Sequence, residues 1–287
     1  MNIRYREFTC PASDGLQLFC REYTSASAAG TVLCLPGLTR NSRDFEALAR
    51  RLAARHRVLT PDLRGRGRSQ WDTNPANYEP GMYAQDMLQL IGMHTDGRVG
   101  LIGTSLGGLV AMLLGAQVPA AIACIVLNDV GPGIGAAGRA RIAAYAGRSH
   151  PHANWQDAVA ETKTNSGGAF PEFTDADWLA YARAGYREDA AGHIVADYDP
   201  RIGDALRSGR TAVPVDLWEI WARLRSMPTL VVHGATSDVL TAATCERMQA
   251  TKPDLACVTV PRRGHPARLD EPVALAALEA FLARHMA

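Results

Sequence analysis

A serine flanked by glycines separates an apolar run from a helix-like segment within residues 98–115, RVGLIGTSLGGLVAMLLG. The apolar run predicts a buried strand, and the segment after Ser105 predicts a helix. Gly103 and Gly107 allow the close backbone approach that a tight strand-to-helix turn requires. Such a turn exposes the Ser105 hydroxyl beside the free N–H groups of the helix start. The pentad therefore predicts a nucleophilic serine, although a glycine-rich turn with a helix-capping serine is the alternative.

Strand-like and helix-like segments alternate along most of the chain, which predicts an α/β fold with a mostly parallel, doubly wound sheet. After the sixth strand this alternation stops, and several helix-like pieces follow without a buried-strand run. We expect residues 131–214 to form a helical lid inserted into a core of residues 1–130 and 215–287. A plain extra helical layer is the alternative. The expected strands are residues 3–10, 16–23, 31–35, 57–60, 99–103, 121–127, 229–233 and 256–260.

Composition limits the possible partners. The chain has 287 residues, 47% of them hydrophobic, and a formal net charge of +1. This balance gives no electrostatic drive toward nucleic acid or an anionic membrane, so we expect a small-molecule substrate. Six cysteines form no C-x-x-C pair and no zinc-type cluster, which favours reduced, buried thiols and no metal site. The first ten residues lack a signal-peptide core, so we expect a cytoplasmic protein and make no prediction of its oligomeric state.

A nucleophilic serine needs a base and a group that orients the base. His265 follows the last predicted strand and precedes the final helix, so it is the expected base. Asp238 follows the strand before it, and the order Ser105, Asp238, His265 is typical of a catalytic triad on such a sheet. Asp129, at the end of the sixth strand, lies at the same edge and is the alternative acid. For the oxyanion hole we expect the N–H groups of Leu106 and Leu38.

These residues together resemble the serine-nucleophile branch of the α/β-hydrolase fold superfamily. The resemblance spans nearly the whole chain and implies acyl transfer through Ser105 without a metal or organic cofactor. Two features depart from the common pattern: Pro36 stands where many relatives have histidine, and the loop from Gly234 to Asp238 is long. The matching pieces are Leu35-Pro36-Gly37-Leu38, the loop Pro61-Asp62-Leu63-Arg64-Gly65-Arg66-Gly67-Arg68-Ser69, Gly103-Thr104-Ser105-Leu106-Gly107-Gly108, Asp238 and Gly264-His265.

The resemblance does not specify the substrate, because relatives cleave esters, thioesters, lactones or carbon–carbon bonds. We expect a serine hydrolase of a small to medium, apolar carboxylic ester. Hydrolysis of a carbon–carbon bond in a ring-fission product and a non-enzymatic ligand receptor are the alternatives. Aromatic side chains in and just after the lid are the expected pocket residues, although such residues more often pack a lid against its core. They are Trp155, Trp178, Tyr181 and Trp218.

Overall fold

The computed structural model describes residues 5–208 and 216–286, and its centre is one eight-stranded sheet. The strand order is β1-β2-β4-β3-β5-β6-β9-β10. Strands β3 to β6, β9 and β10 run parallel, whereas β1 and β2 join antiparallel at one edge. This confirms the predicted mostly parallel sheet. The strands are β1 (Tyr5–Pro11), β2 (Gln17–Tyr23), β3 (Thr31–Leu35), β4 (Arg57–Pro61), β5 (Val99–Thr104), β6 (Ile122–Asn128), β9 (Thr229–Gly234) and β10 (Ala256–Val260).

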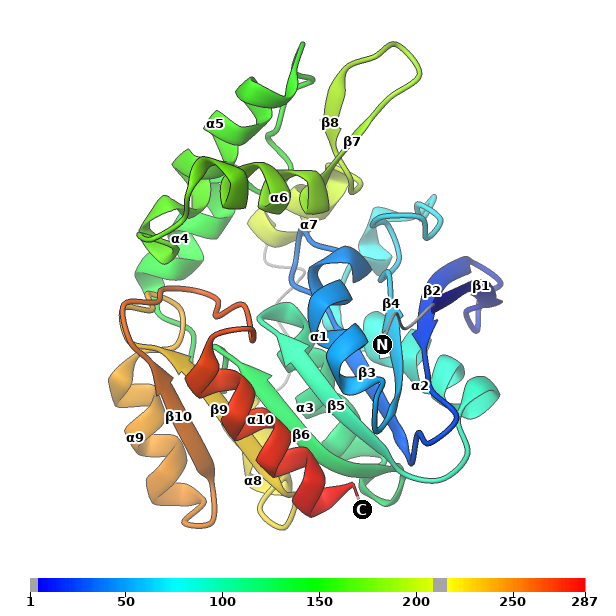
Figure 1. Cartoon of the computed structure of the whole chain (residues 1–287), viewed down its shortest axis with the longest axis vertical. Helices are drawn as coiled ribbons and strands as arrows, with labels where there is room; N and C mark the ends of the chain where they lie inside the picture. The colour runs from blue at the N-terminus through cyan, green and yellow to red at the C-terminus, as the bar shows by residue number, and fades with distance from the viewer. Residues whose placement is uncertain (1–4, 209–215, 287) are drawn as a thin grey trace.

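Helices cover both faces of this sheet (Figure 1). In β3, Val32 and Cys34 pack into the cluster on the face of α1 and α10, while Leu33 and Leu35 pack on the other face. A strand buried on both sides needs a continuous apolar run, which explains why β3 and β6 read that way in the sequence. The core helices are α1 (Glu46–Leu52), α2 (Pro80–His94), α3 (Leu106–Gln117), α8 (Leu217–Arg223), α9 (Ala242–Thr251) and α10 (Pro272–His285).

The lid segment lies over the edge of the sheet at which the parallel strands end (Figure 1). It contains a short antiparallel hairpin, β7 with β8, where the sequence predicts no strand. These strands have three residues each, too few for a recognisable alternation pattern. The expected end of the lid at residue 214 lies outside the described residues. The lid elements are α4 (Ala136–Tyr145), α5 (Trp155–Ser166), α6 (Asp175–Gly185), β7 (Tyr186–Glu188), β8 (Ile194–Ala196) and α7 (Arg201–Arg207).

Core side chains satisfy the carboxyl end of lid helix α6. Asn41 and Arg43, from the loop and turn after β3, donate hydrogen bonds to the Ala184 carbonyl at 3.0 and 3.2 Å. Arg43 also donates to the Tyr186 carbonyl and pairs with the buried Asp197 carboxylate at 2.5 Å. The last carbonyls of a helix lack helical partners, and a cation there also complements the helix dipole. These contacts therefore attach the lid to the core beside the β3 loop.

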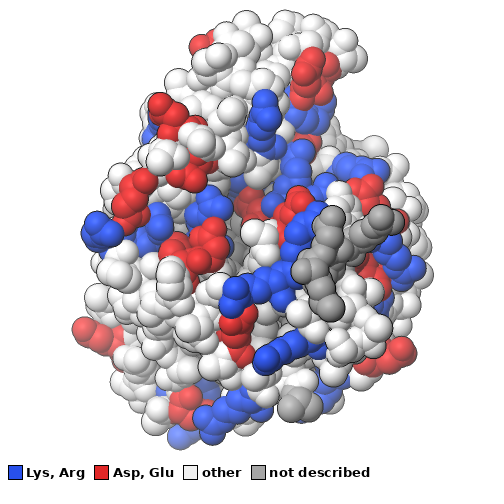
Figure 2. Space-filling model, viewed as in Figure 1, with Lys and Arg blue, Asp and Glu red and all other residues white. Residues whose placement is uncertain are grey.

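Charged residues of both signs occur on the surface of the molecule. On the face in Figure 2, basic and acidic side chains are interspersed. This pattern agrees with a formal net charge of +1. Within residues 5–208 and 216–286, no helix combines the length and the apolar character needed to cross a membrane.

Candidate active site

Ser105 occupies a sharp turn between β5 and α3. Its backbone has φ 53° and ψ −117°, a conformation that non-glycine residues rarely adopt. The turn is so tight that a Cβ on Gly103 would overlap the Gly107 carbonyl, and one on Gly107 would overlap the Leu35 carbonyl. The glycines of the pentad are thus required by backbone contact, as the sequence predicts. The turn leaves the Ser105 side chain partly exposed at the end of the sheet.

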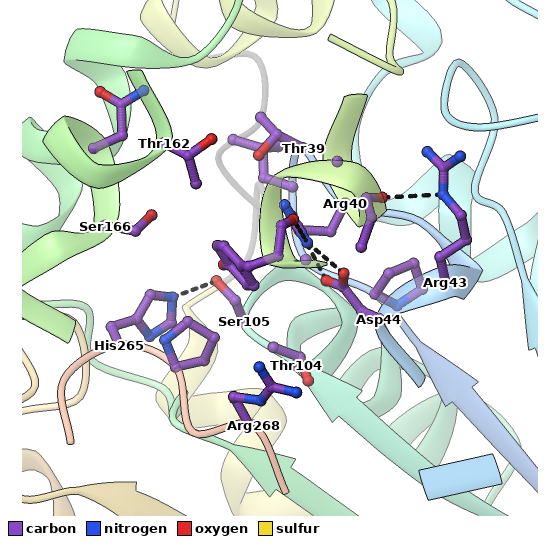
Figure 3. Close-up of a pocket in the computed structure, with 18 of the residues that line it drawn as sticks. Thr39, Arg40, Arg43, Asp44, Thr104, Ser105, Thr162, Ser166, His265 and Arg268 are labelled. Carbon is purple, nitrogen blue, oxygen red and sulfur yellow. Dashed lines mark hydrogen bonds and ion pairs between the residues drawn. The ribbon is translucent and has the colours of Figure 1, made fainter. Parts of the chain in front are cut away.

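The Ser105 hydroxyl meets the imidazole of His265 (Figure 3). Its Oγ lies 2.9 Å from Nε2 of His265, which places the imidazole to accept the hydroxyl proton. His265 follows β10 and is 6% exposed. The lid holds this loop, because the Gly264 N–H donates to the Ala169 carbonyl at 3.0 Å. The structure therefore brings together the expected nucleophile and the expected base.

The partner of His265 on its other side is Asp129, directly after β6. Nδ1 of His265 donates to the Asp129 carboxylate at 2.8 Å. The same carboxylate, which is fully buried, accepts hydrogen bonds from the Gly234 N–H at 2.8 Å and the Ser237 hydroxyl at 2.5 Å. Three donors compensate the loss of hydration of this buried charge. Asp129, the alternative acid in the sequence, is thus the residue placed to orient the base.

Asp238 is not in that position, which corrects the expectation that it orients His265. Its carboxylate forms two hydrogen bonds with the guanidinium of Arg141, at 2.7 and 2.8 Å, and so joins the core to lid helix α4. The Arg141 hydrogen bonds hold the pKa of Asp238 below its usual range. The preceding residue, Ser237, points to the site instead. Sequence reasoning missed Ser237, whose only signal was a hydroxyl residue in the loop after β9.

The two residues expected to form the oxyanion hole lie after β5 and after β3. Leu106 is the first residue of α3, so its N–H has no helical carbonyl to bind. Leu38 belongs to the loop after β3, and its carbonyl accepts from Nε of Arg66 at 2.6 Å, which fixes this part of the loop. A Cβ on the neighbouring Gly37 would lie only 3.8 Å from Cβ of Ser105. The β3 loop therefore passes close to the serine.

A pocket of about 500 Å³ lies between core and lid, lined by Ser105 and His265. Of the four aromatic residues expected there, only Tyr181 is among its lining residues in the described part of the chain. Trp178 is buried in the lid against Phe170, which corrects its expected role.

The other two expected pocket residues, Trp155 and Trp218, also lie away from the pocket, which corrects the prediction. Trp155 packs at the edge of a second small lid cluster that contains Ala158 and Tyr186. Trp218 lies on α8, where the guanidinium of Arg247 stacks 3.7 Å from its ring centre. Indole rings supply large apolar area, and here that area packs within the lid or against the core rather than lining the pocket.

Polar side chains line more of the pocket than the sequence suggests. Helix α5 presents Thr162 and Ser166 toward the cavity that also contains Ser105 and His265 (Figure 3). These residues are four apart and share one face of the helix. The sequence prediction missed this polar face. Its signal was the occurrence of polar residues four positions apart in α5. The lid also lines the pocket with Ser149, Glu161 and Asn165.

No metal-binding arrangement accompanies the site. Among residues 5–208 and 216–286, no group of three or more His, Cys, Asp or Glu side chains is placed to bind a metal ion.

Comparisons with known proteins agree with this architecture. A family model described as the Alpha/beta hydrolase family matches residues 32–278. The chain is 30% identical over 285 residues to the 3-hydroxybutyrate-oligomer hydrolase of Cupriavidus necator, covering 95% of both chains. It is 26% identical over 234 residues to the 2-(acetamidomethylene)succinate hydrolase of Mesorhizobium japonicum, covering 82% of this chain and 81% of the relative.

Solved structures give the same result. The chain superposes on a crystal structure of an alpha/beta hydrolase from Novosphingobium aromaticivorans with a TM-score of 0.92 and 43% identity, covering 98% of each chain. The predicted α/β-hydrolase fold is therefore confirmed, and the similar curated proteins named here are hydrolases. This chain belongs to the alpha/beta hydrolase family.

Proposed function

We propose that this hydrolase cleaves a carboxylic ester through an acyl-enzyme on Ser105. The observation that carries the proposal is the continuous hydrogen-bonded series from Ser105 Oγ through His265 to Asp129, with distances of 2.9 and 2.8 Å. A serine hydroxyl is a weak nucleophile until a positioned base accepts its proton. The buried carboxylate fixes the imidazole tautomer and stabilises the imidazolium that forms.

The reaction proceeds in two halves. Ser105 Oγ attacks the ester carbonyl while Nε2 of His265 takes its proton, and the N–H groups of Leu38 and Leu106 stabilise the oxyanion. The tetrahedral intermediate collapses, and the alcohol leaves with the proton from His265. Water then loses a proton to His265 as it attacks the acyl-enzyme, and the second collapse releases the acid and restores the Ser105 hydroxyl. The Asp129 carboxylate accepts the hydrogen bond from Nδ1 of His265 and so orients the imidazole in both halves.

The pocket combines apolar and aromatic lining residues with polar ones, which supports a short substrate that carries polar groups as well as an apolar part. Its volume of about 500 Å³ suits a small to medium molecule. Hydroxyl and amide side chains of α5 line it together with Tyr181. The similar protein from Cupriavidus necator is named for 3-hydroxybutyrate oligomers, which are esters of a short hydroxy acid. We therefore assign short-chain carboxylic esters as the substrate class.

A p-nitrophenyl ester series from acetyl to dodecanoyl, with Ser105→Ala as the inactive variant, tests this function. We expect kcat/KM to be highest for the short acyl chains and lowest for dodecanoyl, because a pocket of about 500 Å³ suits a small to medium molecule. Ser105→Ala should lower kcat by about a thousandfold or more. Ser27→Ala, on the exposed surface, is the matched control and should retain full activity.

Absence of turnover by the folded wild-type protein would contradict the ester assignment. Such a result would favour carbon–carbon bond hydrolysis or the receptor function, because one fold can carry different functions.

A further inference from the structure

Three carboxylates line the pocket in the described residues, and they differ in how their charge is balanced. Asp44 pairs with Arg40 at 2.5 Å, and Glu46 pairs with Arg50 at 2.8 Å. Within the same part of the chain, Glu161 forms no ion pair with an arginine or a lysine. Among the described residues, Glu161 is therefore the one pocket carboxylate that does not pair with a permanently charged side chain.

The partners of Glu161 are a hydroxyl and an imidazole. Its Oε2 accepts hydrogen bonds from the Ser149 hydroxyl at 3.2 Å and from Nε2 of His152 at 2.7 Å. The side chain remains 24% exposed and lines the pocket. Burial raises the pKa of the nearby Tyr186 phenol, and the negative charge of Glu161 raises it further. Glu161 thus acts as a hydrogen-bond acceptor in the wall of the pocket.

The charge and hydration of Glu161 limit which chemical groups of a substrate fit beside it. A carboxylate would be repelled by the Glu161 charge, and an apolar group would displace water without replacing its hydrogen bonds. A neutral hydrogen-bond donor meets neither penalty.

We propose that Glu161 recognises a hydroxyl group of the substrate, so that the natural substrate is an ester of a hydroxy acid. This inference rests on the proposed ester hydrolysis and adds the group that distinguishes the substrate from other short esters. Glu161 lies on α5, the helix that also presents Thr162 and Ser166 to the cavity around Ser105 (Figure 3). A chain bound between this helix and Ser105 places its hydroxyl at the lid and its ester carbonyl at the serine.

The test compares 3-hydroxybutyrate dimer and trimer whose terminal hydroxyl is either free or O-methylated. Two lengths are used so that the hydroxyl of at least one reaches α5. For the wild-type enzyme we expect kcat/KM to favour the free hydroxyl by about ten- to a hundredfold, the range for a hydrogen bond to a charged acceptor. In Glu161→Gln the preference should fall below about threefold, because the charge that strengthens this bond is removed.

Control variants separate recognition from folding. Glu188→Gln changes an exposed carboxylate of lid strand β7 and should keep the wild-type preference. If Glu161→Gln does not fold, Glu161→Asp keeps the charge but withdraws it by one methylene, and the preference should still fall. Equal rates for free and methylated substrates in the wild type, or an unchanged preference in the folded Glu161 variants, would overturn the proposal.

Failure of ester hydrolysis itself would be recognised separately. If the wild-type enzyme cleaves none of the four molecules faster than Ser105→Ala does, the proposed function is contradicted. Calorimetric binding of the same four molecules to Ser105→Ala and to Ser105→Ala/Glu161→Gln then decides the subsite. Tighter binding of the free hydroxyl that is lost in the double variant supports the Glu161 subsite, and equal binding overturns it.

Discussion

The carboxylate of Asp129 accepts a hydrogen bond from Nδ1 of His265 at 2.8 Å across 136 positions of the chain. The two residues follow β6 and β10, which are separated in the sheet by β9. Asp129 spans this gap from a backbone with φ 55°, and its N–H donates to the Val232 carbonyl of β9. The acid is therefore held by the strand that lies between it and the base.

Exchanging each candidate acid for its amide tests this arrangement. Asp129→Asn should lower kcat by about 10³- to 10⁴-fold, because an amide no longer fixes the required tautomer of His265. Asp238→Asn should lower kcat less than about threefold, because its partner is Arg141. Steady-state kinetics with a short p-nitrophenyl ester measure both effects. A larger loss in Asp238→Asn would show that the acid has been assigned to the wrong residue.

Ser237 is expected to act as a positioning residue for Asp129. Its hydroxyl donates to the carboxylate at 2.5 Å, and the N–H groups of Val239 and Leu240 hold its oxygen at 3.2 and 3.0 Å. Ser237→Ala should lower kcat about tenfold through loss of one hydrogen bond to a buried charge, with KM within about twofold. Ser237→Thr should restore most of the rate. A loss of thermal stability with unchanged kcat would indicate a purely structural role.

The Arg43 attachment of the lid should affect both stability and substrate binding. Arg43→Met leaves the buried Asp197 carboxylate with less compensation and removes a donor to the Ala184 carbonyl. We expect the free energy of unfolding to fall by about 3 kcal/mol and KM to rise. Arg51→Met, which breaks an exposed pair with Glu279, should lower the free energy of unfolding far less, because solvent screens an exposed ion pair. Similar losses in the two variants, measured by urea unfolding, would argue against a lid attachment.

The Arg141–Asp238 pair should contribute stability that depends on pH. Arg141 lowers the pKa of Asp238 in the folded state, so the pair stabilises the fold at pH values above the ordinary carboxyl pKa of 3.8. This contribution is lost as the pH falls through the lowered folded pKa. The difference in Tm between wild type and Asp238→Asn should therefore be constant from pH 7 to 5 and shrink below pH 4. A difference that stays constant down to pH 3 would contradict this linkage.

The meeting of Ser105 and His265 could be predicted because the signals of both residues are local. Gly103 and Gly107 are imposed by the backbone contacts of one turn, and His265 follows the last strand directly. The acid was ambiguous because Asp129 and Asp238 both follow strands that end at the same edge. The backbone conformation of Asp129 directs its carboxylate to His265, and Arg141 binds Asp238 instead. The order of the residues along the chain predicts neither of these features.

The lid was the least predictable part, because its side chains are sorted by tertiary packing. The indole of Trp178 is buried with lid aromatics, while the neighbouring helix turns polar residues such as Thr162 toward the cavity. Composition alone does not separate the aromatic residues that pack within the lid, such as Trp178, from those that line the pocket, such as Tyr181. The helical character of this segment could be predicted, but the direction of each side chain depended on how the helices dock.

Covalent trapping tests the central claim most directly. A fluorophosphonate mimics the ester carbonyl and is attacked by an activated serine. Intact mass followed by peptide mapping should show one phosphonyl group per wild-type chain, located on Ser105. The adduct should be absent from Ser105→Ala and form about a thousandfold more slowly in His265→Ala. An adduct on another residue, or equal labelling of Ser105→Ala, would contradict the assignment of Ser105 as the nucleophile.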